Sequence, residues 1–148
     1  MATNRATFDT VFERLRGILK PYESEMHVSA DDDTWYGLDL APPEERNPTT
    51  WFGAVRRGKR YVSFYLMPVY VAPDLVKGVS PELRRRMQGK SCFNFTRVDA
   101  PLLAELEALT RTGYERTAGN PEWGAAMRVE HGMAHRKAGE KFEAATPG

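Results

Sequence analysis

Two short segments of the chain carry side chains whose types and spacing are suited to binding a ligand. Polar residues alternate with apolar ones in both, which is typical of a β-strand with two unlike faces. On one face the alternation places Tyr61, Ser63, Tyr65, Lys90, Cys92 and Asn94. Small-ligand sites combine flat apolar surface with a few convergent polar groups. We therefore predict that this half-polar sheet face binds an unknown small ligand or a protein.

Basic side chains crowd the predicted hairpin just before the first of these segments. Arg56, Arg57, Lys59 and Arg60 surround Gly58, and a second basic run covers residues 84–86. Together with nearby tyrosines they resemble a surface that binds phosphate and stacks on rings. The formal net charge is only +1 and no nucleic-acid motif is present, so we do not expect nucleic acid as a partner.

No set of residues in the sequence predicts catalysis. Gly89, Lys90 and Ser91 resemble part of a phosphate loop, but the glycine required five residues earlier is Arg84. No histidine is near Cys92 in the sequence, so we expect this thiol to act as a small buried hydrophobe. His131 and His135 follow Glu130 in an order that does not match a zinc protease. We expect binding rather than enzymatic activity.

The composition is that of an ordinary globular domain. The 148 residues are 41% hydrophobic and 28% charged, and the one cysteine cannot form an internal disulfide. No apolar segment follows Met1 as in a signal peptide, and no apolar run reaches membrane-spanning length. These features predict a cytoplasmic protein without a membrane partner.

Local patterns predict helices at both ends of a run of strands. Thr7 is expected to cap a first helix that Pro21 ends, and Asp99 to cap a last long helix. Between them we expect strands and one short helix that begins after Ser80 and runs to Gly89. The strands are predicted at residues 26–30, 34–40, 49–55, 60–70 and 91–95. Pro68 cannot donate to a ladder, so the fourth strand should be at an edge or bulged there. Consecutive strands between helices predict an α+β two-layer sandwich, with both helices on one face of an antiparallel sheet.

The segments from Lys59 to Tyr70 and from Ser80 to Phe95 resemble the YdhG-like family of bacterial domains. The similar motifs are residues 59–63, 66–70, 80–83 and 87–95, and the general layout extends over residues 7–117. The resemblance implies one domain at residues 1–118, a C-terminal extension at 119–148 and the topology of frataxin. At least one relative is described as an intracellular iron chaperone, so iron binding is an alternative function and otherwise no cofactor is expected.

Iron on a frataxin-like fold is associated with acidic residues of the first helix and first strand. The first helix here mixes both signs of charge, so the acidic candidates that remain are Asp31, Asp32, Asp33 and Asp39. Hard cations prefer clustered carboxylates, whereas three adjacent aspartates are also typical of a solvated turn.

The last segment of the chain has a sparse apolar stripe of Trp123, Met127 and Ala134. We predict that residues 121–142 form a helix that covers the half-polar sheet face or crosses to a second subunit. A homodimer or larger homo-oligomer formed through this segment, or through an edge strand near Pro68, is the third alternative.

Overall fold

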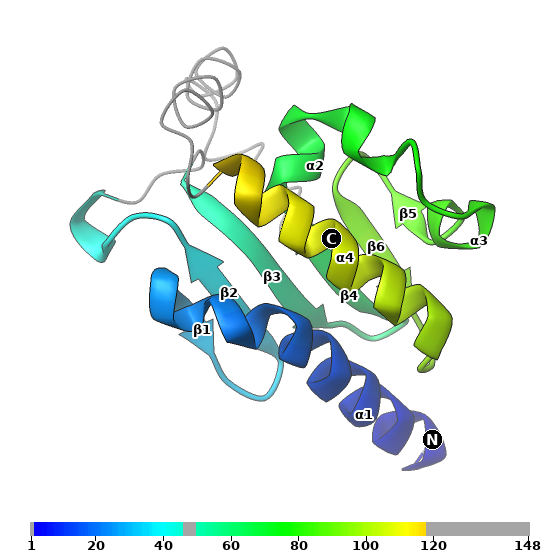
Figure 1. Ribbon diagram of the computed structural model, residues 1–148. Coiled ribbons are helices and arrows are strands. Elements are labelled where there is room, and N and C mark those ends of the chain that lie inside the picture. The colour runs from blue at the N-terminus through cyan, green and yellow to red at the C-terminus, as the bar shows by residue number, and fades with distance from the viewer. Residues whose placement is uncertain (1, 46–49, 118–148) are drawn as a thin grey trace.

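A six-stranded antiparallel sheet is covered on one face by two helices in the computed structural model, which describes residues 2–45 and 50–117 (Figure 1). The strands lie in the order β1-β2-β3-β4-β6-β5. Their bounds are β1 His27–Asp31, β2 Trp35–Asp39, β3 Trp51–Arg57, β4 Val62–Leu66, β5 Met87–Gln88 and β6 Cys92–Phe95. The covering helices are α1, Ala2–Leu19, and α4, Ala100–Thr117. The predicted α+β class is confirmed, and the layers are consistent with the predicted two-layer arrangement.

Both long helices form where apolar residues recur at helical spacing. In α1 the buried residues are Val11, Phe12, Leu15, Ile18 and Leu19. The helix begins at Ala2, so the predicted N-cap at Thr7 is wrong, and after Leu19 the chain tightens into a 3-10 helix, Lys20–Glu25. In α4 the carboxylate of Asp99 accepts the backbone N–H of Leu102 at 3.4 Å, as predicted for a cap.

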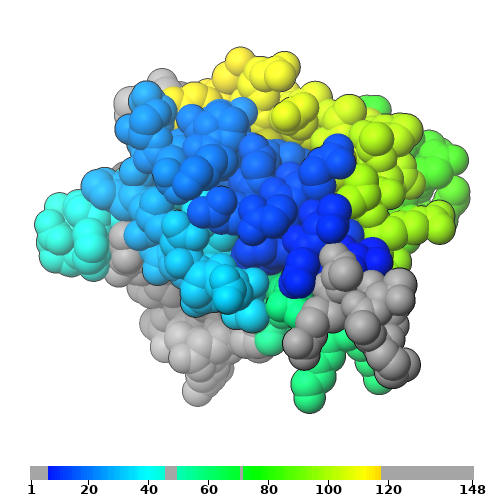
Figure 2. Space-filling view, turned by 90° about the horizontal axis from the view of Figure 1, so that it is seen from below, coloured from blue at the N-terminus to red at the C-terminus, as the bar shows by residue number. Residues whose placement is uncertain are grey.

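The core lies between the sheet and the two helices. Val62, Phe64 and Leu66 of β4 and Phe93 and Phe95 of β6 are all at most 1% exposed, which confirms the predicted apolar face. Figure 2, viewed from below, shows α1 and α4 together on one side of the molecule. The half-polar residues of the same strands therefore face away from the helices.

The chain leaves the sheet after Leu66, although the sequence predicted a strand through residue 70. Met67–Val71 instead forms the short helix α2, with Pro68 in its first turn, where a missing N–H costs nothing. Strand β4 lies between β3 and β6. The expectation of an edge or a bulge at Pro68 is therefore wrong.

The chain between α2 and β6 is built from short elements. A 3-10 helix, Pro73–Val76, precedes α3, Pro81–Arg84, and the hydroxyl of Ser80 accepts the N–H of Leu83 at 3.2 Å as the predicted cap. The helix ends at Arg84, earlier than predicted, and β5 pairs with β6.

Two predicted turns are present with different local chemistry. One carboxylate oxygen of Asp32 accepts the backbone N–H groups of Thr34, at 2.8 Å, and Trp35, at 3.0 Å, and so holds the β1–β2 turn. At the β3–β4 turn Gly58 donates to the carbonyl of Tyr61 at 2.9 Å. Its φ is not positive as expected; of the described glycines only Gly89 is left-handed, with φ 80°.

Some expectations lie outside the described residues, among them the helix at residues 121–142 and the pair of histidines that follows Glu130. No helix in the described part of the chain is long and apolar enough to cross a membrane.

Candidate functional site

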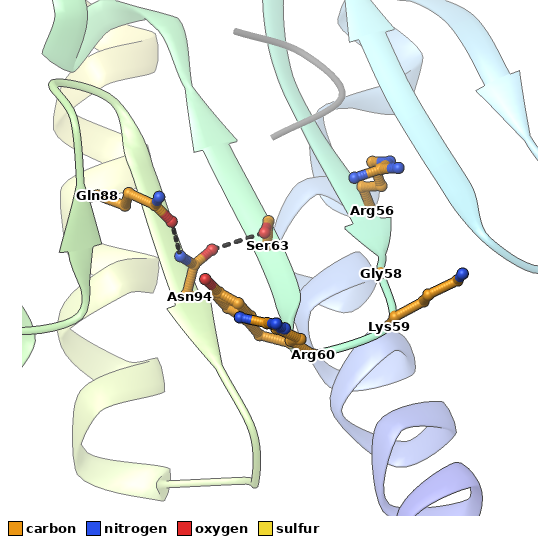
Figure 3. A pocket seen from close by; sticks show the side chains of 8 residues that line it. Arg56, Gly58, Lys59, Arg60, Ser63, Gln88 and Asn94 are labelled. Carbon is orange, nitrogen blue, oxygen red and sulfur yellow. Dashed lines mark hydrogen bonds between the residues drawn. The ribbon is translucent and has the colours of Figure 1, made fainter. Parts of the chain in front are cut away.

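A pocket of about 410 Å³ opens beside the β3–β4 turn, on the sheet face away from the helices (Figure 3). Strands β3, β4, β5 and β6 and the turn all contribute to its walls. The lining residues are Arg56, Gly58, Lys59, Arg60, Tyr61, Ser63, Gln88 and Asn94. None of them is acidic, and three carry a positive charge. We take this pocket as the candidate site.

A chain of hydrogen bonds crosses the three strands that form the polar side of the pocket (Figure 3). The hydroxyl of Ser63 donates to Oδ1 of Asn94 at 2.6 Å, and Nδ2 of Asn94 donates to Oε1 of Gln88 at 2.6 Å. The register places Ser63 directly opposite Asn94, and the backbone N–H of Asn94 donates to the carbonyl of Arg86 at 2.8 Å. The chain of bonds fixes the amide of Asn94 and leaves the Nε2 group of Gln88 as a donor.

The positive side of the pocket comes from the β3–β4 turn and the strand before it. Arg56 lies opposite Ser63 in the β3–β4 pairing, and the exposed Lys59 and Arg60 follow in the turn. Neither Lys59 nor Arg60 forms an ion pair within residues 2–45 and 50–117. No carboxylate of the described residues pairs with either charge, so both are available to an anion.

The structure brings three of the six predicted ligand residues together. Tyr61, Ser63 and Asn94 line the pocket. Lys90 lies at the other end of β6, where its ammonium group is 5.6 Å from the centre of the Tyr70 ring. Tyr65 and Cys92 are on the same face but belong to a separate apolar cluster with Trp51, Ala54 and Met67.

Tyr65 is the most buried polar residue of this face, with 2% of its surface exposed. Its ring lies 6.0 Å from that of Trp51 and 6.5 Å from that of Trp35. Burial raises the pKa of its phenol to about 12, although Arg56 opposes this shift. The side chains of Ser63 and Cys92 are close to the hydroxyl, but within residues 2–45 and 50–117 no group forms a hydrogen bond with this buried O–H.

Cys92 is poorly suited to act as a nucleophile. Burial raises the pKa of its thiol, which disfavours the reactive thiolate. The thiol also donates a hydrogen bond to Oδ1 of Asn94 at 3.4 Å. The one histidine of the described residues, His27, is on β1, which is separated from β6 by three strands of the sheet. The geometry brings no base to the thiol from that residue.

The four aspartates predicted as metal candidates do not converge. Asp31 forms an ion pair with Arg16 at 2.9 Å, and Asp32 holds the turn described above. Asp39 pairs with His27 at the opposite end of the β1–β2 hairpin and accepts the N–H of Ala41. No group of three or more metal-ligating side chains gathers in the part of the chain that the structure describes.

A second pocket, of about 540 Å³, lies on the helix side of the β3–β4 turn. Its lining includes Asp9, Glu13, Asp33 and Arg57. The guanidinium of Arg57 is 3.2 Å from the Asp9 carboxylate. Its one lining cation is thus already neutralised, and the pocket has no uniform charge with which to select a ligand.

Two groups of pocket residues were not in the predicted ligand set. The basic residues of the turn were recognised as a cluster, but their position beside Ser63 depends on the β3–β4 register. Gln88 was assigned to a helix, and only its assignment to a strand opposite Cys92 would have placed it on this face. The alternation of Gln88, Lys90, Cys92 and Asn94 is the signal that could have found it.

Comparisons with models of protein families, with curated proteins and with solved structures find no match to this chain.

Proposed function

We propose that this protein is a non-catalytic binding module that holds a small anionic ligand in the pocket beside the β3–β4 turn. The observation that carries the proposal is a pocket whose described lining residues include three cations and no carboxylate. An anion bound there would pair with Lys59 and Arg60 and would accept hydrogen bonds from them. The ordered amides of Asn94 and Gln88 would fix its orientation.

The assignment to the YdhG-like proteins, and with it the frataxin-like topology, is part of the same proposal. It is supported by the helix–sheet–helix order and by the position of the resembling segments. Residues 59–70 and 80–95 contain β4, β5 and β6, which form one side of the sheet and part of the pocket, together with α3 and most of α2. A cytoplasmic location belongs to this proposal as well.

Iron binding and homo-oligomer formation stay predictions and receive no support from the described geometry. Asp31 is paired with Arg16, and Asp32 accepts hydrogen bonds from the turn backbone. The strand expected to offer an edge near Pro68 is paired on both sides.

Titration of the full chain with inorganic phosphate and with citrate, followed by amide NMR shifts, tests the proposal. We expect saturable shifts at the backbone of Gly58, Arg60 and Ser63. In the variant Lys59→Gln/Arg60→Gln affinity should fall at least about tenfold, because each charge-assisted hydrogen bond contributes about 1.5–3 kcal/mol.

The control variant is Lys77→Gln/Arg111→Gln, which changes net charge equally at exposed residues outside the pocket. It should bind as the unmodified protein does. Equal loss in both double variants would show a general charge effect, and absence of saturable binding by either anion would refute the proposed function.

A further inference from the structure

We infer that the ligand is a phosphomonoester of a small polar molecule, recognised in two parts: a dianionic phosphate by the β3–β4 turn and a hydroxyl-bearing body by the amides of β5 and β6. This inference rests on the proposed function and names its ligand class. It is carried by the count of charges, the direction of the hydrogen bonds and the size of the pocket.

The charge of the pocket matches a dianion better than a monoanion. Lys59 and Arg60 both line the pocket and form no ion pair in the described part of the chain. Arg60 lies toward Asn94, whereas Lys59 extends away from it (Figure 3). Rotation of the exposed Lys59 side chain would bring a second positive charge to the same ligand. A carboxylate supplies one negative charge, whereas a phosphomonoester carries about −1.5 to −2 at neutral pH. Arginine also pairs well with phosphate, since its planar fork of N–H groups meets two oxygens at once.

The hydrogen bonds of the pocket leave donors at one end and a hydroxyl oxygen in the middle. Because Ser63 gives its proton to Asn94, its oxygen presents lone pairs rather than a donor. Because Oε1 of Gln88 is taken by Asn94, its Nε2 group is the part left to donate. A hydroxyl group is both donor and acceptor, so a polyhydroxy body can satisfy both residues in turn.

The volume requires more than a free phosphate ion. About 410 Å³ lies within the range of about 300–1,000 Å³ that small-molecule pockets show. One water occupies about 30 Å³ of liquid, so inorganic phosphate would leave most of the space to solvent. The half-buried Tyr61 adds a ring to the wall beside the cations, which gives the carbon skeleton of the ligand a surface to contact.

The matched probes are glucose 6-phosphate and glucuronate, which share a sugar body and differ in the anionic group at one carbon. Binding to the full chain is followed by NMR shifts of the Gln88 and Asn94 side-chain amides at constant ionic strength. At pH 7.5 we expect glucose 6-phosphate to bind at least about fivefold more tightly than glucuronate, because only the phosphate pairs with both cations.

Lowering the pH from 7.5 to 5.0 separates charge from shape. The second pKa of a phosphomonoester is near 6, while a sugar carboxylate stays ionised at pH 5. The described residues that line the pocket include no histidine and no carboxylate, and their ionisable side chains are those of Arg56, Lys59, Arg60 and Tyr61. Glucose 6-phosphate should therefore lose about five- to tenfold in affinity, and glucuronate should change little.

The substitution Gln88→Leu tests the second part of the site at an exposed position where folding is not at risk. It should weaken glucose 6-phosphate about threefold to fivefold, for the loss of one hydrogen bond to the sugar, and leave inorganic phosphate unchanged. Equal affinity of Gln88→Leu and the unmodified protein for glucose 6-phosphate would overturn the two-part site. Equal affinity of the unmodified protein for the two probes would overturn the phosphate assignment.

These results separate the inference from the proposed function. If inorganic phosphate or citrate binds and depends on Lys59 and Arg60, but glucose 6-phosphate binds no better than glucuronate, the inference alone fails. If none of the anions binds, the proposed function fails with it.

Discussion

At the level of single residues, the sheet face away from the helices combines buried aromatic rings with polar groups, and these polar groups differ in whether they are hydrogen-bonded. The hydroxyl of Ser63 is 2.6 Å from its acceptor on Asn94. The hydroxyl of Tyr65, two residues further along β4, is buried without a hydrogen-bond partner among the described residues. On the helix face, by contrast, the hydroxyl of Tyr36 donates to Glu23 at 2.8 Å. The two buried tyrosines thus offer a matched pair for measuring what a phenol O–H contributes.

Replacing Tyr65 with phenylalanine should leave the free energy of unfolding unchanged or raise it by up to about 1 kcal/mol. The reason is that a buried polar group without a hydrogen bond costs about 1–3 kcal/mol, and the substitution removes it while keeping the ring. Urea denaturation at pH 7 measures the difference. The substitution Tyr36→Phe is the control and should lower stability by about 1–2 kcal/mol, because it deletes a bond to a carboxylate. A loss above about 1 kcal/mol in Tyr65→Phe would show that its hydroxyl has a partner after all.

The residues that sequence patterns could find are those whose role depends on alternation alone. Ser63 and Asn94 were predicted on one face because each alternates with buried phenylalanines. Tyr65 and Cys92 satisfy the same alternation, yet they belong to the apolar cluster with Trp51 and do not line the pocket. Which part of a face is hollow depends on side chains from several strands, and no single segment contains that information.

At the level of elements, the β4–α2 junction decides how the sheet and helix layers are joined. The sequence around Pro68 continues the alternation of β4, so periodicity predicts a longer strand. A proline also fits the first turn of a helix, and the structure uses this second option. The choice depends on packing against α4, where a Cβ on Gly113 would lie only 3.1 Å from the Cβ of Pro68.

The substitution Gly113→Ala should therefore destabilise the protein by about 1 kcal/mol, despite the better helix propensity of alanine. The added Cβ would be 3.1 and 3.2 Å from two ring carbons of Pro68, and a proline ring cannot rotate away. Thermal or urea unfolding measures the change.

The control for this substitution is Gly17→Ala in α1, where a Cβ would meet nothing within 4 Å. It should stabilise the protein by about 0.5–1 kcal/mol, which is the propensity gain without a clash. If both variants gained stability equally, α2 would have shifted to accommodate the added methyl group of α4. The proposed constraint at the junction would then be wrong.

At the level of the whole molecule, two consecutive residues of β3 point to opposite faces of the sheet. Arg57 points to the helix side, where it pairs with Asp9 of α1 at 3.2 Å. Arg56 points to the other side and lines the pocket. The class and the layers follow from element order, and the sequence predicted them. The pocket is open because the helices cover only one face of the sheet. The cations beside the β3–β4 turn therefore line the opposite, uncovered face.

A ligand in this pocket should stabilise the entire fold, since four strands of the sheet and their connecting turn contribute to its walls. Binding to the folded state alone adds RT ln(1 + [L]/Kd), which is about 1.4 kcal/mol at ten times the Kd. For a domain of this size each kcal/mol raises Tm by about 2–4 °C. Inorganic phosphate at ten times its measured Kd should therefore raise Tm by about 3–6 °C over chloride of equal ionic strength.

The variant Lys59→Gln/Arg60→Gln separates this effect from the general exclusion of phosphate from protein surfaces, which also favours the folded state. Exclusion acts on both proteins alike, whereas site binding requires the two turn cations. We expect the variant to keep only the part of the Tm rise that comes from surface exclusion. An equal rise in the two proteins would mean that phosphate stabilises the fold without occupying the pocket, because no other difference between them bears on surface exclusion.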